Sequence, residues 1–442
     1  MVQPAVHPGP RRCTLAVPRG SLPSDSLTLP NSRVPVVARP DVLVAGGGSA
    51  GLSAAVAAAR NGADVLLLER FSYLGGLASG GLIILLLTMD DGAGRQAVGG
   101  LCQELVDRME RRQAIYYPPR SSWNDPDPKL VEHYARWGLV WGSGPHRVRY
   151  SVAFDPQAFV LAADEMVKEA AVRVLYQTWA CEPVVEGRTV TALVIQNKAG
   201  RQAIIPKVVI DATGDGDIIA AAGERFELER VHPWLWFLMS GAQLPEPSAE
   251  RRGLYFQTPG KGHVLVPWGG EARTTHKIDA TNPDEVSAAL AECRQLVAEE
   301  AGRLKQGTPG FEDAYVSMTA DQLGITESRR LQGEYVMTRD DLDREFPDAI
   351  ARTGHWTKYD CVYNVPYRSL LPLGLDNVLV AGRCISVDHR VHHATKEIPP
   401  CMATGQAAGT AAALAAREGG NVRQVPVSTL RKRLLEQAAI LG

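Results

Sequence analysis

The stretch DVLVAGGGSAGLSAAVAAARNGADVLLLER, residues 41–70, is the most informative part of this 442-residue chain. It predicts a strand, a glycine turn, an alanine-rich helix and a second strand. Gly46, Gly48 and Gly51 follow the apolar run 42–45 in the spacing G-x-G-x-x-G. The first glycine permits a tight turn, the second lets a pyrophosphate approach the backbone, and the third lets helix and strand pack closely. Glu69 ends the second strand, where a carboxylate can accept hydrogen bonds from ribose hydroxyls. The stretch therefore predicts a dinucleotide-binding unit.

Length and composition exclude several classes of protein. A chain of 442 residues predicts two closely joined domains. Its 47 lysines and arginines nearly balance 49 acidic residues, which gives no argument for a nucleic acid or a membrane surface as partner. The seven cysteines are dispersed without a C-x-x-C pair, which argues against a disulfide framework, a metal site or an iron–sulfur cluster. A reducing, cytoplasmic setting fits this composition. The longest apolar run, Leu82–Leu87, is far shorter than the roughly 20 residues that span a bilayer.

A second glycine loop narrows the nucleotide to a flavin. The segment FSYLGGLASGG, residues 71–81, follows the first unit and contains Gly75 and Gly76. An NAD dehydrogenase has no need of such a loop here, whereas a flavin must lie against backbone that carries few side chains. Alternating strands at 172–176, 189–197 and 203–210 predict a β-meander inserted into the nucleotide domain. The segment VVIDATGDGD, residues 208–217, predicts a strand that brings Gly214 to the edge of the cofactor.

The C-terminal third adds a further strand and a candidate catalytic segment. NVLVAGR, residues 377–383, predicts a buried strand, and GQAAGTAAALAAREG, residues 405–419, a helix whose N-terminus could stabilise negative charge on a reduced flavin. Between them, SVDHRVHHATKEIPP, residues 386–400, is predicted to be a loop because of its paired prolines. Ligands bind in loops that leave the carboxyl ends of parallel strands, so His389 is a candidate general acid or base. There are two alternatives: the segment is only a polar surface loop, or three of its histidines (His389, His392 and His393) form a metal site.

Six motifs, taken together and in this order, resemble the FAD-dependent oxidoreductase family. They are G-G-G-x-A-G, E-R-x-x-x-L-G-G, D-A-T-G-D-G-D, E-S-R-R, A-G-R-C-I-S and G-Q-A-A-G, at residues 46–51, 69–76, 211–217, 327–330, 381–386 and 405–409. The family is related to the flavin core of the A subunit of heterodisulfide reductase and, distantly, to succinate dehydrogenase and fumarate reductase flavoproteins. This chain lacks the clustered cysteines by which the heterodisulfide reductase protein holds its iron–sulfur centres. The resemblance implies FAD as cofactor, held by Gly46, Gly48, Gly51, Glu69, Arg70, Gly75, Gly76, Ser79, Gly214, Gly382, Arg383 and Gly405.

The resemblance also implies the fold and its division into domains. The expected class is α/β, with an FAD-binding Rossmann-like domain of the glutathione-reductase type, an inserted β-meander and a second, α+β substrate domain. The FAD domain would comprise residues 36–223 and 361–420, and the substrate domain residues 224–360. Residues 1–35, rich in proline and without periodicity, are predicted to be a disordered leader, and residues 421–442 a C-terminal tail.

The expected function is that of an FAD-dependent oxidoreductase. It would transfer a hydride between flavin N5 and a CH–OH or CH–CH group of a small organic substrate. His389 would move the proton, and Arg329 or Arg330 would anchor the substrate, since the planar guanidinium suits a carboxylate. A salt bridge between the domains is the alternative role for either arginine. Lys396 stands where the family commonly has arginine, which leaves the substrate open. The alternative function is a flavin-containing electron-transfer subunit of a larger complex, without its own small-molecule substrate.

Overall fold

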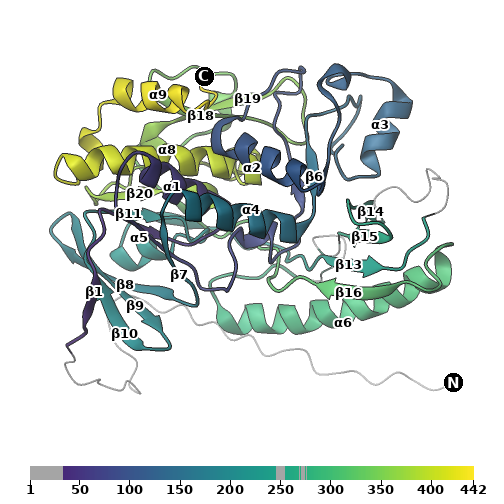
Figure 1. Ribbon diagram of the computed structural model, residues 1–442, viewed down its shortest axis with the longest axis horizontal. Coiled ribbons are helices and arrows are strands. Elements are labelled where there is room, and N and C mark those ends of the chain that lie inside the picture. Colours follow the sequence, from purple (N-terminus) through teal and green to yellow (C-terminus); the bar gives the residue numbers. More distant parts are fainter. Residues whose placement is uncertain (1–32, 245–253, 268, 270–273, 275) are drawn as a thin grey trace. The chain divides into compact units, whose positions relative to one another are not determined.

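A computed structural model describes residues 33–244, 254–267, 269, 274 and 276–442. Residues Pro35–Gly442 form one compact unit, in which helices surround several sheets (Figure 1). The largest sheet is parallel and helices lie in most of the connections between its strands, so the predicted α/β class is confirmed. Most of the predicted leader, residues 1–32, lies outside the described residues. Within the described part, no helix has the length and apolar composition needed to cross a membrane.

The central sheet has five parallel strands in the order β20-β11-β2-β3-β7. Their bounds are Val378–Val380, Val208–Asp211, Val42–Ala45, Val65–Leu68 and Arg173–Leu175. The strands β2 and β3 are buried along their whole length, as expected for a parallel sheet covered on both faces. Helix α1 (Ser49–Arg60) connects them, which confirms the predicted strand, turn, helix and strand. The register pairs Ala45 with Asp211, so β2 and β11 end side by side.

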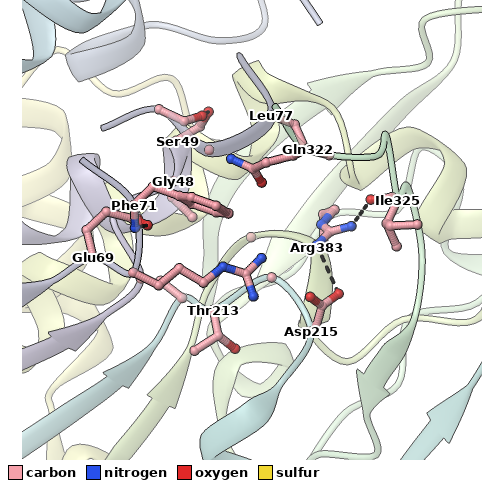
Figure 2. Close-up of a pocket in the computed structure, with 18 of the residues that line it drawn as sticks. Gly48, Ser49, Glu69, Phe71, Leu77, Thr213, Asp215, Gln322, Ile325 and Arg383 are labelled. Carbon is pink, nitrogen blue, oxygen red and sulfur yellow. Dashed lines mark hydrogen bonds and ion pairs between the residues drawn. The ribbon is translucent and has the colours of Figure 1, made fainter. Parts of the chain in front are cut away.

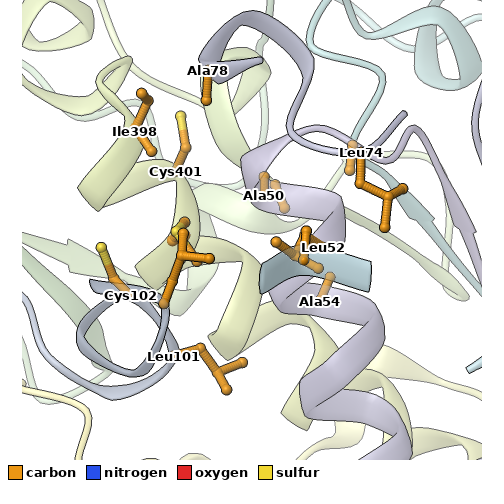
Figure 3. Close-up of a cluster of buried hydrophobic side chains, with 14 of the residues drawn as sticks. Ala50, Leu52, Ala54, Leu74, Ala78, Leu101, Cys102, Ile398 and Cys401 are labelled. Atoms are coloured by element: carbon orange, nitrogen blue, oxygen red, sulfur yellow. The ribbon is translucent and has the colours of Figure 1, made fainter. Parts of the chain in front are cut away.

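Two helices far apart in sequence cross closely beside this sheet. Helix α8 (Ile398–Arg417) lies on α1, and both are rich in alanine and glycine. A Cβ atom on Gly405 would lie 2.1 Å from the carbonyl oxygen of Ala50, and one on Gly409 would lie 2.0 Å from that of Ala54. Figure 3 shows the buried side chains around this crossing, which include Cys401. The two glycines are therefore required for the approach of the two helices, which fixes the start of α8 against the start of α1.

The inserted sheet differs from the predicted meander: β8, β9 and β10 pair antiparallel, and β1 adds to β10 as a parallel edge strand. It has the order β1-β10-β9-β8, with bounds Val36–Ala38, Gly200–Ile204, Thr189–Asn197 and Trp179–Glu186. Residues 172–176, predicted as its first strand, instead form β7 of the parallel sheet. The predicted strand 203–210 is two strands, because Pro206 interrupts it and β11 turns into the parallel sheet. The strand Trp179–Glu186 lacks a clear alternation of apolar residues and was missed.

The region between β11 and β20 contributes a smaller sheet and a long helix. The sheet has the order β14-β15-β13-β16, with bounds Phe256–Gln257, His263–Val266, Phe237–Ser240 and Tyr315–Thr319. Helix α6 spans Pro283–Gly307, and Asn282 caps its start. Two antiparallel pairs complete the region. They are β12 with β17 (Phe226–Leu228, Arg329–Leu331), which are distant in sequence, and the hairpin of β18 with β19 (Ala349–Gly354, Val362–Pro366).

The segment predicted as a loop at residues 386–400 is helical, so that prediction was wrong. Helix α7 (His389–Thr395) begins after Asp388, whose carboxylate accepts a hydrogen bond from the backbone of Val391. Pro399 and Pro400 then lie in the first turn of α8. Proline is tolerated there because the first helical N–H groups have no partner within the helix. The predicted tail contains a helix too, α9 (Val427–Glu436).

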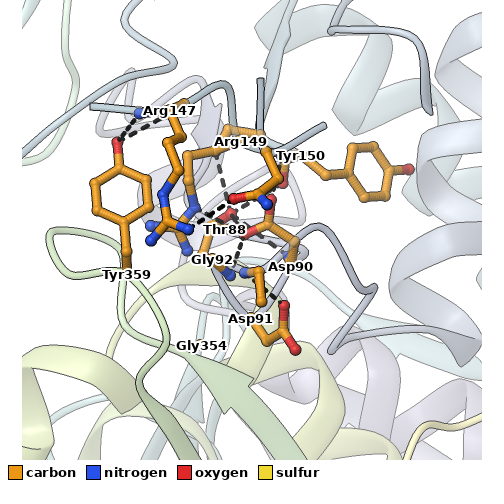
Figure 4. Close-up of polar contacts among 12 residues, drawn as sticks. Thr88, Asp90, Asp91, Gly92, Arg147, Arg149, Tyr150, Gly354 and Tyr359 are labelled. Carbon is orange, nitrogen blue, oxygen red and sulfur yellow. Dashed lines mark hydrogen bonds and ion pairs between the residues drawn. The ribbon is translucent and has the colours of Figure 1, made fainter. Parts of the chain in front are cut away.

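A buried ion pair joins the segment before helix α2 (Gly100–Arg111) to the segment before β6 (Val152–Phe154), and its arginine also contacts the turn after β18. Nε of Arg149 lies 2.8 Å from Oδ1 of Asp90, and both side chains are almost fully buried. The other carboxylate oxygen of Asp90 accepts a hydrogen bond from the backbone of Tyr150, and Arg149 also donates to the carbonyl of Lys358 (Figure 4). Gly354 approaches so closely that its Cβ would lie 2.1 Å from the carbonyl oxygen of Asp90.

Candidate cofactor and active site

A cavity of about 390 Å³ lies where the strands of the central sheet end. Its wall includes the first residues after β2, β3, β11 and β20, which are Gly46, Glu69, Ala212 and Ala381. In open α/β sheets, ligands bind outside the carboxyl ends of the strands. The volume lies in the range of small-molecule and cofactor sites. Figure 2 shows the side chains that line it.

The two predicted glycine loops form one side of this cavity and contact each other. The N–H of Gly75 donates to the carbonyl of Gly47 over 2.9 Å, and Gly48 pairs with Gly75 as an isolated bridge. A Cβ on Gly76 would lie 3.1 Å from Cα of Gly48, so a side chain there would narrow the gap between the loops. Helix α1 starts beside them without a side-chain cap and without an acidic residue in its first turn. Free N–H groups at a helix start favour a phosphate group, so these residues fit a dinucleotide.

The carboxylate of Glu69 is held rigidly at one end of the cavity. One of its oxygens accepts a hydrogen bond of 2.7 Å from the N–H of Gly47, and the other accepts one of 2.8 Å from the N–H of Phe71. Burial raises its pKa, and the two backbone donors oppose that shift. Each oxygen keeps a second lone pair, so the carboxylate can also accept from a hydroxyl group. This arrangement fits the predicted ribose contact.

Aromatic rings accompany Arg70 at the same end. The guanidinium carbon lies 5.0 Å from the centre of the Phe71 ring and 5.6 Å from that of Trp179, within the range of cation–π attraction. Trp179 is 53% exposed although it is large and apolar, and it lines the cavity. An exposed tryptophan at a cavity wall is typical of a binding surface rather than of a core.

Charged groups gather at the other end, around the motif at 211–217. Nη2 of Arg383 lies 3.0 Å from Oδ1 of Asp215, and the same guanidinium donates to the carbonyl of Ile325 (Figure 2). Asp217 also lines the cavity and pairs with Nη1 of Arg329 over 2.9 Å. Burial raises the pKa of Asp217 to about 6, and the negative charges of two neighbouring aspartates add to the shift. Asp217 is thus a titratable acid in the cavity wall.

Helix α8 begins seven residues before the predicted site of its N-terminus, Gly405. Ile398 and Cys401 of its first turn line the cavity, whereas Gly405 packs on Ala50. Of the residues predicted to bind the cofactor, nine line the cavity: Gly46, Gly48, Glu69, Arg70, Gly75, Gly76, Gly214, Gly382 and Arg383. Three do not: Gly51 packs on Gly46, Ser79 donates to the carbonyl of Leu74, and Gly405 serves the helix crossing.

Two of the predicted catalytic residues, Arg330 and His389, come together around the carboxylate of Glu327, and neither they nor Arg329 line the cavity. Nη1 of Arg330 lies 2.6 Å from Oε1 of Glu327, and Nδ1 of His389 lies 2.9 Å from Oε2. Nδ1 of His392 approaches Oε2 at 3.5 Å. Burial opposes the charge of this carboxylate, but the two histidines and Arg330 outweigh it and lower its pKa to about 2. The side chain of His389 is 64% exposed and that of Arg330 is 2% exposed.

Residues 327–330 do not line the cavity, but two of them contact residues that do. The hydroxyl of Ser328 donates to Asp215 over 2.5 Å, and Arg329 pairs with Asp217, so this block supports two residues that line the cavity. The pair Arg329–Asp217 matches the alternative of a salt bridge between the two predicted domains. Arg330 pairs with Glu227 and Glu327 instead.

The three histidines considered as a metal site do not converge. His389 and His392 face Glu327, whereas the ring of His393 lies 5.4 Å from that of His355 and 5.0 Å from that of Trp356. Among the described residues, the only grouping of suitable ligands is Glu229, Glu327 and His389. The guanidinium of Arg330 already pairs with the carboxylate of Glu327, and its positive charge disfavours binding of a metal cation there.

Several residues of the cavity wall were missed by sequence reasoning. They are Phe71, Trp179, Asp215, Asp217 and Gln322, and Lys396 was noted only as a departure from the family and not as a site residue. The two aspartates carried a usable signal, because acidic residues directly after a parallel strand lie at the ligand edge of the sheet. The others come from a strand start, a loop and a helix end, whose convergence depends on tertiary structure.

Comparisons with known proteins supplement this geometry. The sequence pattern of a family described as FAD dependent oxidoreductase matches residues 41–235 and 240–434. No curated protein is similar to the chain in sequence. Similar solved structures include p-nitrophenol 4-monooxygenase from Pseudomonas putida, at 14% identity, covering 90% of this chain and 84% of that one, with a TM-score of 0.49. A geranylgeranyl bacteriochlorophyll reductase-like protein from Thermoplasma acidophilum is 15% identical over 91% of this chain and 84% of that one, with a TM-score of 0.47. L-amino acid deaminase from Proteus vulgaris is 12% identical, covering 88% of this chain and 92% of that one, with a TM-score of 0.44.

Proposed function

The chain belongs to the FAD-dependent oxidoreductase family, and from this premise we propose that it is a dehydrogenase or reductase of a small organic substrate. FAD is its cofactor. When bound, the flavin would supply the electron chemistry, exchanging a hydride at N5 with a CH–OH or CH–CH group of the substrate. The observation that carries the proposal is the cavity itself: two glycine loops and a rigid carboxylate at one end, and titratable groups at the other.

The residues of the cavity wall divide into two groups. We propose that Gly48, Gly75 and Gly76, with the start of α1, hold the pyrophosphate, and that Glu69 holds the ribose. Gly214, Gly382 and Arg383 would then face the flavin ring at the other end. Gly51, Ser79 and Gly405 would act indirectly, because each holds a neighbouring loop or helix in position.

The substrate would be oriented and supplied with protons by polar groups near the ring end. We retain His389 as the proposed proton-transfer residue and Arg329 or Arg330 as the proposed anchor. The carboxylate of Glu327 would fix the tautomer of His389 through the contact at Nδ1, leaving Nε2 free to exchange a proton. Asp217, whose pKa burial raises to about 6, is a second candidate for proton transfer because it lines the cavity.

The finer classification is part of the same proposal. We assign residues 36–223 and 361–420 to an FAD domain of the glutathione-reductase type and residues 224–360 to the substrate domain. The order of the six motifs supports a relation to the flavin core of the A subunit of heterodisulfide reductase and, distantly, to succinate dehydrogenase and fumarate reductase flavoproteins. The substrate would be a small molecule, and an external electron donor or acceptor would complete the cycle.

Rapid-mixing reduction of the bound flavin tests the function. The purified protein should be yellow and contain one FAD per chain. Mixed anaerobically with a panel of hydroxy acids, sugars and reduced nicotinamides, the flavin should be bleached by at least one compound at a rate that saturates with concentration. A protein that retains FAD but reacts with none of them, and only with a partner protein, would favour the electron-transfer subunit instead. A protein that cannot be reconstituted with FAD would refute both.

A further inference from the structure

The start of α8 is poorly equipped to stabilise an anion, although it lines the cavity. A helix N-terminus normally offers unpaired N–H groups that carry the positive end of its dipole. In α8 the second and third residues are Pro399 and Pro400, which have no N–H. The N–H of Cys401 is already bonded to the carbonyl of Glu397. Of the first three residues of this helix, only Ile398 can donate.

The charge of Arg383, one of the two arginines in the cavity wall, is already neutralised by an ion pair. Arg383 forms an ion pair with Asp215 at 3.0 Å and donates to the carbonyl of Ile325. Its charge therefore has a counter-ion in the protein. Arg70, the other arginine of the wall, lies against the rings of Phe71 and Trp179.

Within the described part of the chain, Lys396 differs from Arg383 in having no counter-ion and from Arg70 in having no aromatic ring beside its charge. It is the last residue before the N-cap of α8, it is half-buried, and its side chain lines the cavity. Among the described residues, its ammonium group has no hydrogen-bond or ion-pair partner. The adjacent carboxyl group compensates it only in part, because burial raises the pKa of Glu397 to about 7 against the opposing effect of Lys396. The carbonyl of Lys396 accepts a hydrogen bond from the thiol of Cys401, whose sulfur lies 3.7 Å from the Cβ position of Gly382. A cation without a full counter-ion thus lies near the end of the cavity assigned to the flavin ring.

We propose that Lys396, and not the helix dipole of α8, supplies the positive charge that stabilises the negative charge of the reduced flavin. A fixed charge beside developing negative charge acts strongly in a cavity that excludes water. This inference rests on the proposed function, since it requires FAD in this cavity. It assigns a role to Lys396 that does not depend on the identity of the substrate.

The test uses the full chain loaded with FAD and two readouts that need no substrate. Sulfite adds to the oxidised ring of bound flavins and leaves a negative charge on it, so its dissociation constant reports the local positive charge. The reduction potential, measured against a reference dye, reports the same charge independently. Lys396→Met should weaken sulfite binding roughly 10- to 100-fold, as expected for loss of one nearby unit charge, and should lower the potential. Lys396→Arg should bind sulfite within about threefold of the wild type.

Lys358→Met provides a matched control. It removes the same charge from a residue that lines a different cavity, beside Tyr359 and Arg147, and should leave both readouts unchanged. If Lys396→Met is isolated without FAD, the dissociation constant of FAD is compared instead, and a loss that Lys396→Arg restores supports the inference. Sulfite affinity and potential equal to wild type in Lys396→Met would overturn it, even if KM for an anionic substrate rose. Failure of the wild type to bind FAD would refute the proposed function instead.

Discussion

Gly51 packs so closely on Gly46 that a Cβ atom on Gly51 would lie 1.7 Å from the carbonyl oxygen of Gly46. Gly48, in the same turn, has space: the nearest heavy atom to its Cβ position is Cα of Gly76, at 3.9 Å. The φ of Gly48 is −65°, which suits any amino acid. Two glycines of one motif therefore meet different needs. Gly51 is required by the fold, whereas a side chain on Gly48 would enter the cavity.

Gly48→Val should consequently give protein that folds but does not hold FAD. The apoprotein should melt within a few degrees of wild-type apoprotein, and the flavin absorption should be absent or restored only by a large excess of FAD. Gly51→Ala should lower the free energy of unfolding of the apoprotein by at least roughly 1–3 kcal/mol, the usual cost of overpacking. Thermal unfolding of both apoproteins, with FAD titrations, distinguishes the two effects. Equal destabilisation by both substitutions would contradict this division.

Trp179→Ala should weaken the binding of FAD about tenfold, because stacking of a base on an aromatic ring contributes about 1–3 kcal/mol. The prediction follows from the exposed ring of Trp179 in the cavity wall, beside Arg70 and near Glu69. FMN lacks the adenosine group, so its dissociation constant should not change in the same variant. Fluorescence titration of the apoprotein with each flavin makes the measurement. Equal weakening for FAD and FMN would place the effect of Trp179 elsewhere.

Sequence reasoning succeeded where the pattern was local. The strand, glycine turn, helix and strand of residues 42–68 are contiguous, and turn chemistry and apolar runs specify them together. It failed where the signal was ambiguous. Pro399 and Pro400 were interpreted as a loop, although proline is equally at home in the first turn of a helix. The strand Trp179–Glu186 was missed because it lies at a sheet edge and alternates poorly.

For the candidate site, too, the sequence predicted residues of local motifs but not residues that distant segments bring together. Residues predicted from the glycine motifs line the cavity, because each motif builds its own piece of the wall. Lys396 and Trp179 reach the same cavity from segments separated by more than 200 residues, and only the α1–α8 crossing and the sheet order bring them there. The prediction of His389 rests on its residue type and on its place in the segment that follows a parallel strand. Its position beside Glu327, and outside the cavity wall, depends on the fold of α7.

Arg149→Met should destabilise the protein without changing its FAD content. The side chains of Arg149 and Asp90 are 3% and 1% exposed, so removing the arginine leaves a buried carboxylate without its counter-ion. Such a loss costs about 3–5 kcal/mol of unfolding free energy. The control is Arg433→Met, which breaks the exposed pair with Glu436 and should cost less than about 1 kcal/mol. Denaturant unfolding measures both. A cost below about 1 kcal/mol for Arg149→Met would show that Asp90 is not buried as described.

One buried and one partly buried histidine should make the protein lose stability in mild acid. Burial lowers the pKa of His355 to about 3 and that of His393 to about 4, with neighbouring positive charges adding to both shifts. Because both values lie below about 6.5, the value for an unfolded histidine, the unfolded state binds protons first as the pH falls. The contribution of these two histidines to the free energy of unfolding should therefore be constant above about pH 7. It should decrease as the pH falls from about 6.5 to 4. His355→Gln cannot be protonated and should flatten the pH dependence of the melting temperature, whereas His263→Gln, at an exposed histidine, should not. A wild-type melting temperature that is unchanged between about pH 7 and 4.5 would contradict the prediction.

His389→Asn tests the proposed proton transfer directly. The side chain of His389 is 64% exposed, and Glu327 keeps its contacts with Arg330 and His392 when it is replaced. FAD content and melting temperature should therefore remain close to those of the wild type. Reduction of the flavin by substrate should slow by about 10²–10⁴-fold, the usual contribution of one positioned general acid or base. Arg390→Gln, at the exposed neighbour on α7, should reduce at the wild-type rate.

His389 does not line the cavity wall, whereas Asp217 does, so the comparison with Asp217→Asn is decisive. If His389→Asn reduces normally while Asp217→Asn is slowed, the proton passes through the aspartate, and the contact of His389 with Glu327 is structural.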